Sequence, residues 1–245
     1  MSFVIAPFSW VFSSFLYFSS FLTRYGISVQ VEEVVPKERK SPFHHLIHGS
    51  KILFSHRDLA FVTVSNTLIN AGTMAANTLV PVIALSHFSI PPSTYAFAAV
   101  LGSGAGILGA LCASKLTGRL GLRATRVIVA NLLVVGALLI FLLITGIIDS
   151  LPFVWICVQY MLNGASAAIV MVSGSDIAPK VVNSEILGTV LGASRTMLLG
   201  VMPLSAILFG ALGSMLGAGF ATACWLGLTV LAVIPNLFLK KSSIL

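Results

Sequence analysis

Charged residues are scarce in this sequence. Only 9% of its 245 residues are Asp, Glu, Lys or Arg, and 57% are hydrophobic, whereas an ordinary soluble domain is about 25% charged. This composition excludes a typical soluble globular domain. The 14 Lys and Arg outnumber the 7 Asp and Glu, which gives a formal net charge of +7. In a soluble protein such an excess would indicate nucleic-acid binding, but here the cations flank long apolar runs and we expect no nucleic-acid partner.

Sequence signals for catalysis and cofactor binding are also missing. The chain has no Walker sequence, no Ser/His/Asp order and no pair of carboxylates within an apolar run, so we expect neither an enzyme nor a cofactor. Cys112, Cys157 and Cys224 lie inside apolar runs without ligand spacing and are interpreted as packing residues. His44 and His48 are four residues apart, as two metal ligands on one helix face would be. Because no carboxylate or cysteine completes a shell, we expect solvated histidines and no metal site.

Apolar runs long enough to cross a bilayer occur seven times. A membrane-spanning helix needs about 20 mostly apolar residues to cross roughly 30 Å of hydrocarbon. The predicted spans are residues 2–22, 59–85, 94–113, 127–148, 152–173, 190–212 and 218–239. The sequence therefore predicts an all-α, polytopic membrane helix bundle.

The positions of the cations predict how this bundle is oriented. All Lys and Arg fall within residues 24–57, 115–126, 180–195 and 240–241, and the intervening connections carry only Asp149 as a formal charge. Cytoplasmic loops retain Lys and Arg during insertion. We therefore predict a multi-pass protein of the plasma membrane with its N-terminus outside and its C-terminus in the cytoplasm.

The predicted spans divide the chain into four parts. Residues 1–23 predict a transmembrane helix; a signal peptide is the alternative, but there is no basic leader and no convincing cleavage site. An outside N-terminus without a polar leader resembles a chain that begins partway through a longer one. Residues 24–57 predict a cytoplasmic linker, in which Ser41-Pro42 starts an amphipathic helix on the inner membrane surface. Residues 58–241 predict a six-helix domain, and residues 242–245 a cytoplasmic tail.

Amide and hydroxyl side chains form two stripes within the spans. In span 59–85, polar residues follow the first one at distances of one, two and three helical turns. This stripe comprises Asn66, Asn70, Thr73 and Asn77. The stripe in span 152–173 comprises Gln159, Asn163 and Ser166. Amides cannot face lipid tails without a high desolvation cost, so they face water, a substrate or another helix. Two interpretations stay open: hydrogen bonds between helices, or the lining of a polar cavity, which the equivalent placement of the stripes on the first helix of two triplets favours.

Glycine is the other patterned residue. Pairs spaced as small-xxx-small motifs occur at Gly102/Gly106, Gly188/Gly192 and Gly213/Gly217, and such pairs allow two helices to approach closely. Tight packing is the favoured interpretation, and interfaces that slide during transport are the alternative. Pro81 and Pro203 each remove a backbone donor within a span and should kink it.

Two cytoplasmic stretches resemble loops of major facilitator superfamily transporters. Residues 118–123, Gly118-Arg119-Leu120-Gly121-Leu122-Arg123, are similar to that family's D-R-x-G-x-R pattern, with Gly118 at the usual position of an acid. Residues 179–188 are similar to the P-x-E-x-x-G-R loop of drug-efflux-like members, including macrolide- and siderophore-exporter relatives, although Thr189 stands at the position of the arginine. The resemblance implies that Gly118, Arg119, Gly121 and Arg123 form a cytoplasmic gating loop, with Arg119, Arg123 and Arg126 anchored at the inner surface.

The resemblance further implies a fold and a function. The last six spans would be the C-terminal six-helix half of a facilitator-type fold, preceded by one helix equivalent to the sixth of a full transporter. Efflux of a small amphipathic molecule by alternating access is the implied function, with both stripes contacting substrate or water. The glycine-rich third and sixth spans would meet the missing half. The implied partners are the lipid bilayer, the small-molecule substrate, and either a separate N-terminal half or a second copy of the chain. The alternative is a truncated product without transport activity, or a membrane scaffold.

Overall fold

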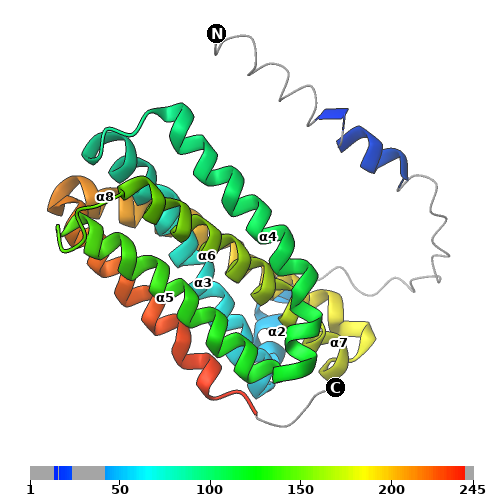
Figure 1. Cartoon of the computed structure of the whole chain (residues 1–245). Helices are drawn as coiled ribbons and strands as arrows, with labels where there is room; N and C mark the ends of the chain where they lie inside the picture. The colour runs from blue at the N-terminus through cyan, green and yellow to red at the C-terminus, as the bar shows by residue number, and fades with distance from the viewer. Residues whose placement is uncertain (1–13, 16, 24–41, 241–245) are drawn as a thin grey trace. The chain divides into compact units, whose positions relative to one another are not determined.

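The computed structural model describes residues 14–15, 17–23 and 42–240. Of the N-terminal unit, residues 1–40, the described residues are helical and exposed. The rest of the predicted span 2–22, most of the predicted linker and the predicted tail lie outside the described residues. The described part of the second unit, residues 41–245, is a bundle of helices (Figure 1).

The described part of the second unit consists of helices, without strands. They are α2 (Pro42–Ser55), α3 (Arg57–Val82), the π-helical turn η1 (Ile83–His87), α4 (Pro92–Leu120), α5 (Leu122–Ile144), α6 (Pro152–Gly174), α7 (Ile177–Val181) and α8 (Ser184–Leu237). Five helical stretches are long and apolar enough to cross a membrane, namely Arg57–His87, Pro92–Leu120, Leu122–Ile144, Pro152–Val181 and Ser184–Leu237. For the described residues, the prediction of an all-α fold with several helices long and apolar enough to span a membrane is confirmed.

Proline and unusual backbone angles mark the helix boundaries. Pro92 and Pro152 occupy the first turns of α4 and α6, where a missing N–H costs nothing. Leu151, just before α6, has a φ of 53°, so the chain reverses there in a left-handed conformation. Pro81 lies inside α3 and is followed directly by η1. A π-turn is one way to accommodate the carbonyl groups that the proline leaves without a donor.

Helix α8 consists of two helical segments joined at a glycine. A continuous helix of 54 residues would extend about 80 Å, far more than the roughly 30 Å of a bilayer core. Gly217 interrupts it with a φ of 85° and a ψ of 158°, angles that side-chain-bearing residues rarely adopt. The predicted boundary between spans 190–212 and 218–239 therefore falls at this residue.

The two halves of α8, residues 184–216 and 218–237, run in opposite directions along α3. In the first half, the α3 residue Asn70 contacts Leu198, and Leu79 contacts Gly213, so the two helices run parallel. In the second half the order reverses: Ser65 bonds Ala232, whereas Gly72 lies against Trp225 and Thr229. Residues 57–237 thus form six alternating helical segments.

These six segments form two triplets that pack symmetrically. The first helix of each triplet, α3 or α6, packs against the second and third helices of the other triplet: α3 against both halves of α8, and α6 against α4 and α5. Gly121, between α4 and α5, has a φ of 79° and a ψ of 159°, almost the same angles as Gly217. Because each triplet contains an odd number of crossings, the second triplet is inverted relative to the first.

Two glycines of α4 lie against the backbone of α6 inside the bundle. A Cβ added to Gly102 would lie 2.9 Å from the carbonyl oxygen of Tyr160, and one added to Gly109 would lie 2.6 Å from that of Ala165. The glycines therefore let α4 and α6 approach to backbone contact. This supports tight packing for these two glycines. The expectation that this span meets a missing half stays a prediction, because another face of α4, with Leu108 and Leu111, is exposed.

Helix α2 packs on the bundle along one edge only. Leu53 is fully buried, and Gly49 lies directly against the backbone of Thr189 in α8. On the other edge Phe43, Ile47 and Phe54 are exposed. The predicted amphipathic helix therefore exists, but its apolar residues divide between the bundle and an exposed edge that can enter a membrane interface.

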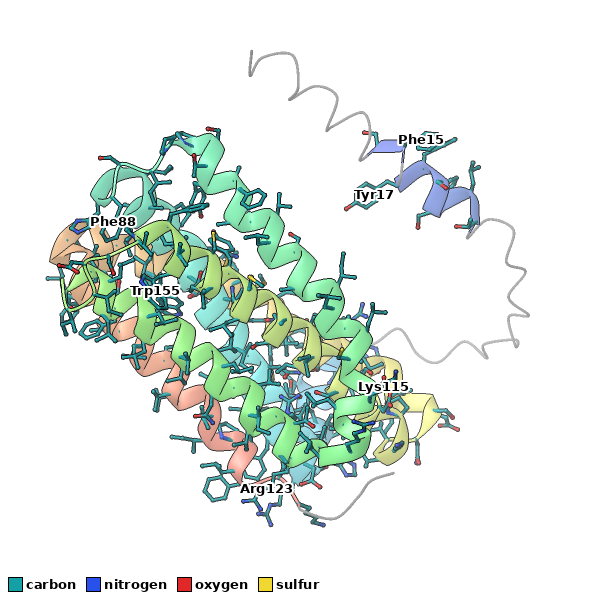
Figure 2. The ribbon with its side chains drawn as sticks, viewed as in Figure 1. Phe15, Tyr17, Phe88, Lys115, Arg123 and Trp155 are labelled. Atoms are coloured by element: carbon teal, nitrogen blue, oxygen red, sulfur yellow. The ribbon has the colours of Figure 1, made fainter. Side chains whose placement is uncertain are left out.

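The described cations gather toward one end of the bundle. This end is where α4 meets α5, α6 is followed by α7 and the second half of α8 finishes; Figure 2 shows Lys115 and Arg123 there, and Phe88 and Trp155 toward the opposite end. All described Lys and Arg lie in the half nearer this end, whereas the described part of the opposite connections carries Asp149. The folded chain thus has the charge asymmetry that the orientation prediction needs.

Candidate functional site

The polar stripe of α3 is largely engaged in bonds to other helices. Asn66 Oδ1 accepts a hydrogen bond from Arg126 at 2.6 Å, and Asn70 Nδ2 donates to the carbonyl oxygen of Leu198 at 3.2 Å. Thr73 Oγ1 donates to Asn163 Oδ1 at 3.3 Å. Asn77 is exposed. Three of the four predicted residues therefore connect helices, and one faces outward.

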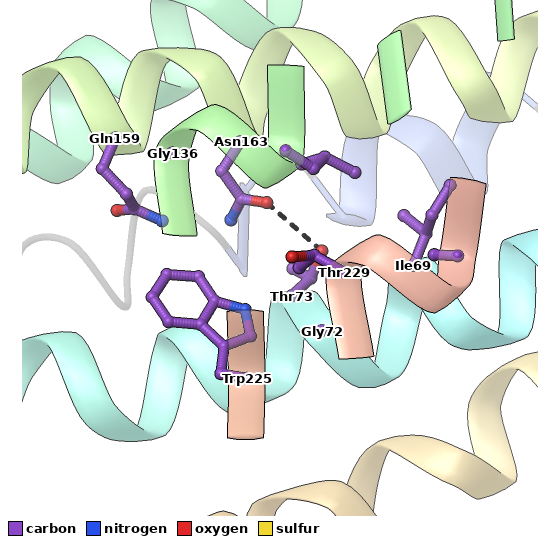
Figure 3. Close-up of a pocket in the computed structure, with 10 residues that line it drawn as sticks. Ile69, Gly72, Thr73, Gly136, Gln159, Asn163, Trp225 and Thr229 are labelled. Atoms are coloured by element: carbon purple, nitrogen blue, oxygen red, sulfur yellow. Dashed lines mark hydrogen bonds between the residues drawn. The ribbon is translucent and has the colours of Figure 1, made fainter. Parts of the chain in front are cut away.

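The stripes of α3 and α6 meet near the middle of the bundle. Thr73 and Asn163, joined by their hydrogen bond, lie on the first helices of the two triplets (Figure 3). Aligning Gly121 with Gly217 places Asn70 of the α3 stripe on Ser166 of the α6 stripe, and it places Thr63 and Thr67 of α3 on Gln159 and Asn163. Both first helices thus carry polar residues at equivalent positions of the repeat, although Asn66 and Thr73 align with the apolar Leu162 and Ile169.

A small cavity adjoins this contact. It has a volume of about 10 Å³ and is lined by α3, α5, α6 and the second half of α8, including Gly72, Gly136 and Thr229. Such a volume is close to the minimum for one water molecule. Figure 3 shows Gln159 and Asn163 reaching from α6 toward Trp225 and Thr73.

Two buried polar atoms beside the cavity have no hydrogen-bond partner among the described residues. They are Oε1 of Gln159 and Nε1 of Trp225, whose side chains are 2% and 3% exposed. An unpaired polar group in an apolar interior costs about 1–3 kcal/mol. One group is an acceptor and the other a donor, so a small polar molecule between them could satisfy both.

A second polar centre lies nearer the cationic end. Arg126 is fully buried, and its Nε donates to Asn236 Oδ1 at 2.9 Å, its Nη1 to the Val170 carbonyl oxygen at 3.2 Å and its Nη2 to Asn66. Asn236 is also fully buried, and its Nδ2 donates to Ser65 Oγ at 2.7 Å. The guanidinium thus connects α3, α5, α6 and α8 through neutral oxygen acceptors.

The prediction that Arg126 anchors at the inner surface is wrong. The sequence places it with Arg119 and Arg123 at helical spacing, but Gly121 ends α4 and α5 starts afresh at Leu122. Arg126 therefore lies inside the second turn of α5, facing the bundle. A methyl group on Gly174 would lie 3.2 Å from its Nη1, so the glycine leaves room for the guanidinium.

The predicted gating loop borders a groove at the cationic end. Gly118 and Arg119 are exposed, Arg123 is half-buried, and Gly121 supplies the left-handed turn. All four line the groove, which has a volume of about 630 Å³.

The histidines and cysteines form no site among the described residues. The rings of His44 and His48 stack with their centroids 6.4 Å apart, and in residues 42–240 no group of three His, Cys, Asp or Glu side chains is placed to hold a metal ion. The three cysteines are free thiols.

Sequence reasoning missed three residues of these sites. Trp225 counts as apolar, and only its burial reveals the unpaired Nε1. Asn236 follows no stripe, and its partner Ser65 lies beside, not on, the predicted stripe. The sequence did offer a signal for the position of Arg126, namely the turn-forming Gly121. A new helix that begins after Gly121 has residue 126 in its second turn, inside the span.

Comparison with family models, curated proteins and solved structures found no match to this chain. The function is therefore argued from the residues and their geometry.

Proposed function

We propose that this chain is one half of a membrane transporter, of the kind that the major facilitator resemblance implies. It would move a small amphipathic molecule by alternating access, with α3 and α6 bordering the path. A separate N-terminal half or a second copy of the chain would complete the pathway.

One observation carries this proposal: the polar faces of two inverted triplets meet within the spanning region, beside unpaired buried groups. Interhelical hydrogen bonds alone would leave no reason to bury Gln159 Oε1 and Trp225 Nε1 without partners. An amphipathic substrate would accept from the indole N–H, donate to the amide oxygen and lie against the indole ring.

The size of the cavity sets a condition on this mechanism. A ligand site usually needs about 300–1,000 Å³, and this cavity has about 10 Å³. Substrate binding therefore requires the first helices of the two triplets to separate, which would break the Thr73–Asn163 bond. Relative movement of repeats is how inverted-repeat transporters alternate access.

Coupling to a proton gradient would need a group from outside this cavity. The residues that line it include no Asp or Glu, and mid-membrane proton relays use such side chains. If transport is proton-coupled, the carboxylate would belong to the partner half.

A membrane scaffold is the second candidate, and the first half of α8 favours it. Only 11% of the most apolar window of α8 is buried, against 50% for the window that begins in α3. A spanning helix with so little cover contacts either lipid or another membrane polypeptide.

Liposome flux measurements test the transport proposal. The chain would be reconstituted alone and with a covalently linked second copy, and flux of ethidium, a fluorescent amphipathic cation, would be followed. Gln159→Leu and Asn163→Leu should each lower flux roughly tenfold, since each removes one hydrogen-bonding group. The matched control is Asn131→Leu, because Asn131 is exposed and bonds only its own helix at Val127.

Flux that falls in the α6 variants and not in Asn131→Leu would support transport over the scaffold. Unchanged flux in both α6 variants, with normal expression, would refute the assignment of the cavity. No flux from the single or the linked chain would exclude a second copy as the completing half, and would leave a separate N-terminal half or the scaffold.

A further inference from the structure

We infer that the groove at the cationic end binds the headgroup of an anionic phospholipid. This site is independent of the transport proposal, since it requires only that the helices span a membrane.

The charge of the groove is the first argument. Four cations line it from different elements: Arg119 at the end of α4, Arg123 at the start of α5, Lys180 in α7 and Lys240 after α8. Only two carboxylates, Asp58 and Asp176, line the same groove. The excess of positive charge matches a phosphate, and arginine can bind phosphate through two parallel N–H donors.

The position and lining of the groove select a lipid over a soluble anion. It lies at the end of the spanning helices, where headgroups are found, and apolar side chains such as Val127, Ile177 and Leu237 alternate with the charges. A free phosphate would leave these apolar residues uncovered, whereas the glycerol backbone and the start of an acyl chain would cover them. Basic pockets between spanning helices are suited to acidic headgroups for this reason.

Two residues that line the groove each carry a buried oxygen without a hydrogen-bond partner among the described residues, and these oxygens indicate which headgroup fits. They are Asp58 Oδ1 and Thr117 Oγ1. A headgroup with hydroxyl groups, as in phosphatidylglycerol, would place its phosphate among the cations and donate its hydroxyl hydrogens to these oxygens. Phosphatidylcholine has neither the net charge nor the donors.

Binding of short-chain lipids to the purified full chain tests the inference. Dioctanoyl phosphatidylglycerol and dioctanoyl phosphatidylcholine would be titrated onto the protein in neutral detergent, with retained lipid counted by native mass spectrometry. We expect saturable binding of one phosphatidylglycerol, weakened by added salt, and no saturable binding of phosphatidylcholine.

Matched double variants locate the site. Arg119→Gln with Arg123→Gln should weaken phosphatidylglycerol binding roughly thirtyfold, about fivefold for each surface cation. The control is Lys51→Gln with Arg195→Gln, which removes the same charge from positions outside the groove and should change binding less than threefold.

Three results would overturn the inference. Equal binding of the two lipids would show that headgroup charge is not recognised. Equal effects of the two double variants would show that the lipid does not bind in this groove. Displacement of the lipid by an equimolar amount of inorganic phosphate would show a simple anion site. If the arginine variant does not fold, salt dependence and lipid selectivity of the unchanged chain decide the question, because a site without headgroup charge recognition would show neither.

Discussion

The buried Arg126 network makes the sharpest prediction about stability. Removing the arginine leaves two neutral amide oxygens, on Asn66 and Asn236, without their donor. Each such orphan costs about 1–3 kcal/mol, although losing a buried charge offsets part of this. We therefore expect Arg126→Met, which keeps much of the side-chain length, to lower the free energy of unfolding by about 2–3 kcal/mol.

Removing an acceptor should cost more than removing the arginine. Asn236→Leu leaves a fully buried guanidinium with fewer partners, and it also removes the bond to Ser65. An incompletely compensated buried charge costs about 3–5 kcal/mol. Once the asparagine is gone, the arginine is a liability, so adding Arg126→Met to Asn236→Leu should restore part of the lost stability.

Unfolding in mixed micelles of neutral detergent and dodecyl sulfate measures these differences. Arg119→Met is the control, because Arg119 is exposed, and it should change the unfolding free energy by less than about 0.5 kcal/mol. An Asn236→Leu variant as stable as the unchanged chain would show that the buried arginine does not need this acceptor. A double variant less stable than Asn236→Leu alone would show that the arginine without its asparagine is not a liability.

Three further predictions concern packing, the α8 turn and topology. Gly109→Ala should destabilise the bundle by about 1–3 kcal/mol, because its Cβ would lie 2.6 Å from a backbone oxygen of α6, whereas Gly104→Ala, with open space around it, should be neutral or slightly stabilising in the same unfolding assay. Gly217→Ala should cost about 1–2 kcal/mol from backbone strain, again measured against Gly104→Ala; an equal effect of the two would place the turn elsewhere. Single cysteines introduced at Lys115 and Asp149 in a cysteine-free chain should be labelled by impermeant maleimide from opposite sides of the membrane, and labelling of both from one side would refute the alternating spans.

Local sequence was enough to predict the helices and their approximate ends. The apolar runs predicted six spans between residues 59 and 239, and each has a helical counterpart between Arg57 and Leu237. This worked because a bilayer requires long apolar helices, and because Pro92, Pro152, Gly121 and Gly217 mark their ends through backbone chemistry alone. Helical spacing also placed Asn66, Asn70 and Thr73 on a face that contacts other helices, whereas Asn77 is exposed.

Which partner each face meets was decided only by the tertiary structure. Asn66 and Thr73 lie on one stripe, yet one bonds a buried arginine of α5 and the other an asparagine of α6. Periodicity assigns a residue to a face of its own helix, but the neighbour of that face depends on how all six segments pack. For the same reason the sequence placed Arg126 at the membrane surface, and only the packed bundle shows it buried and surrounded by oxygen acceptors.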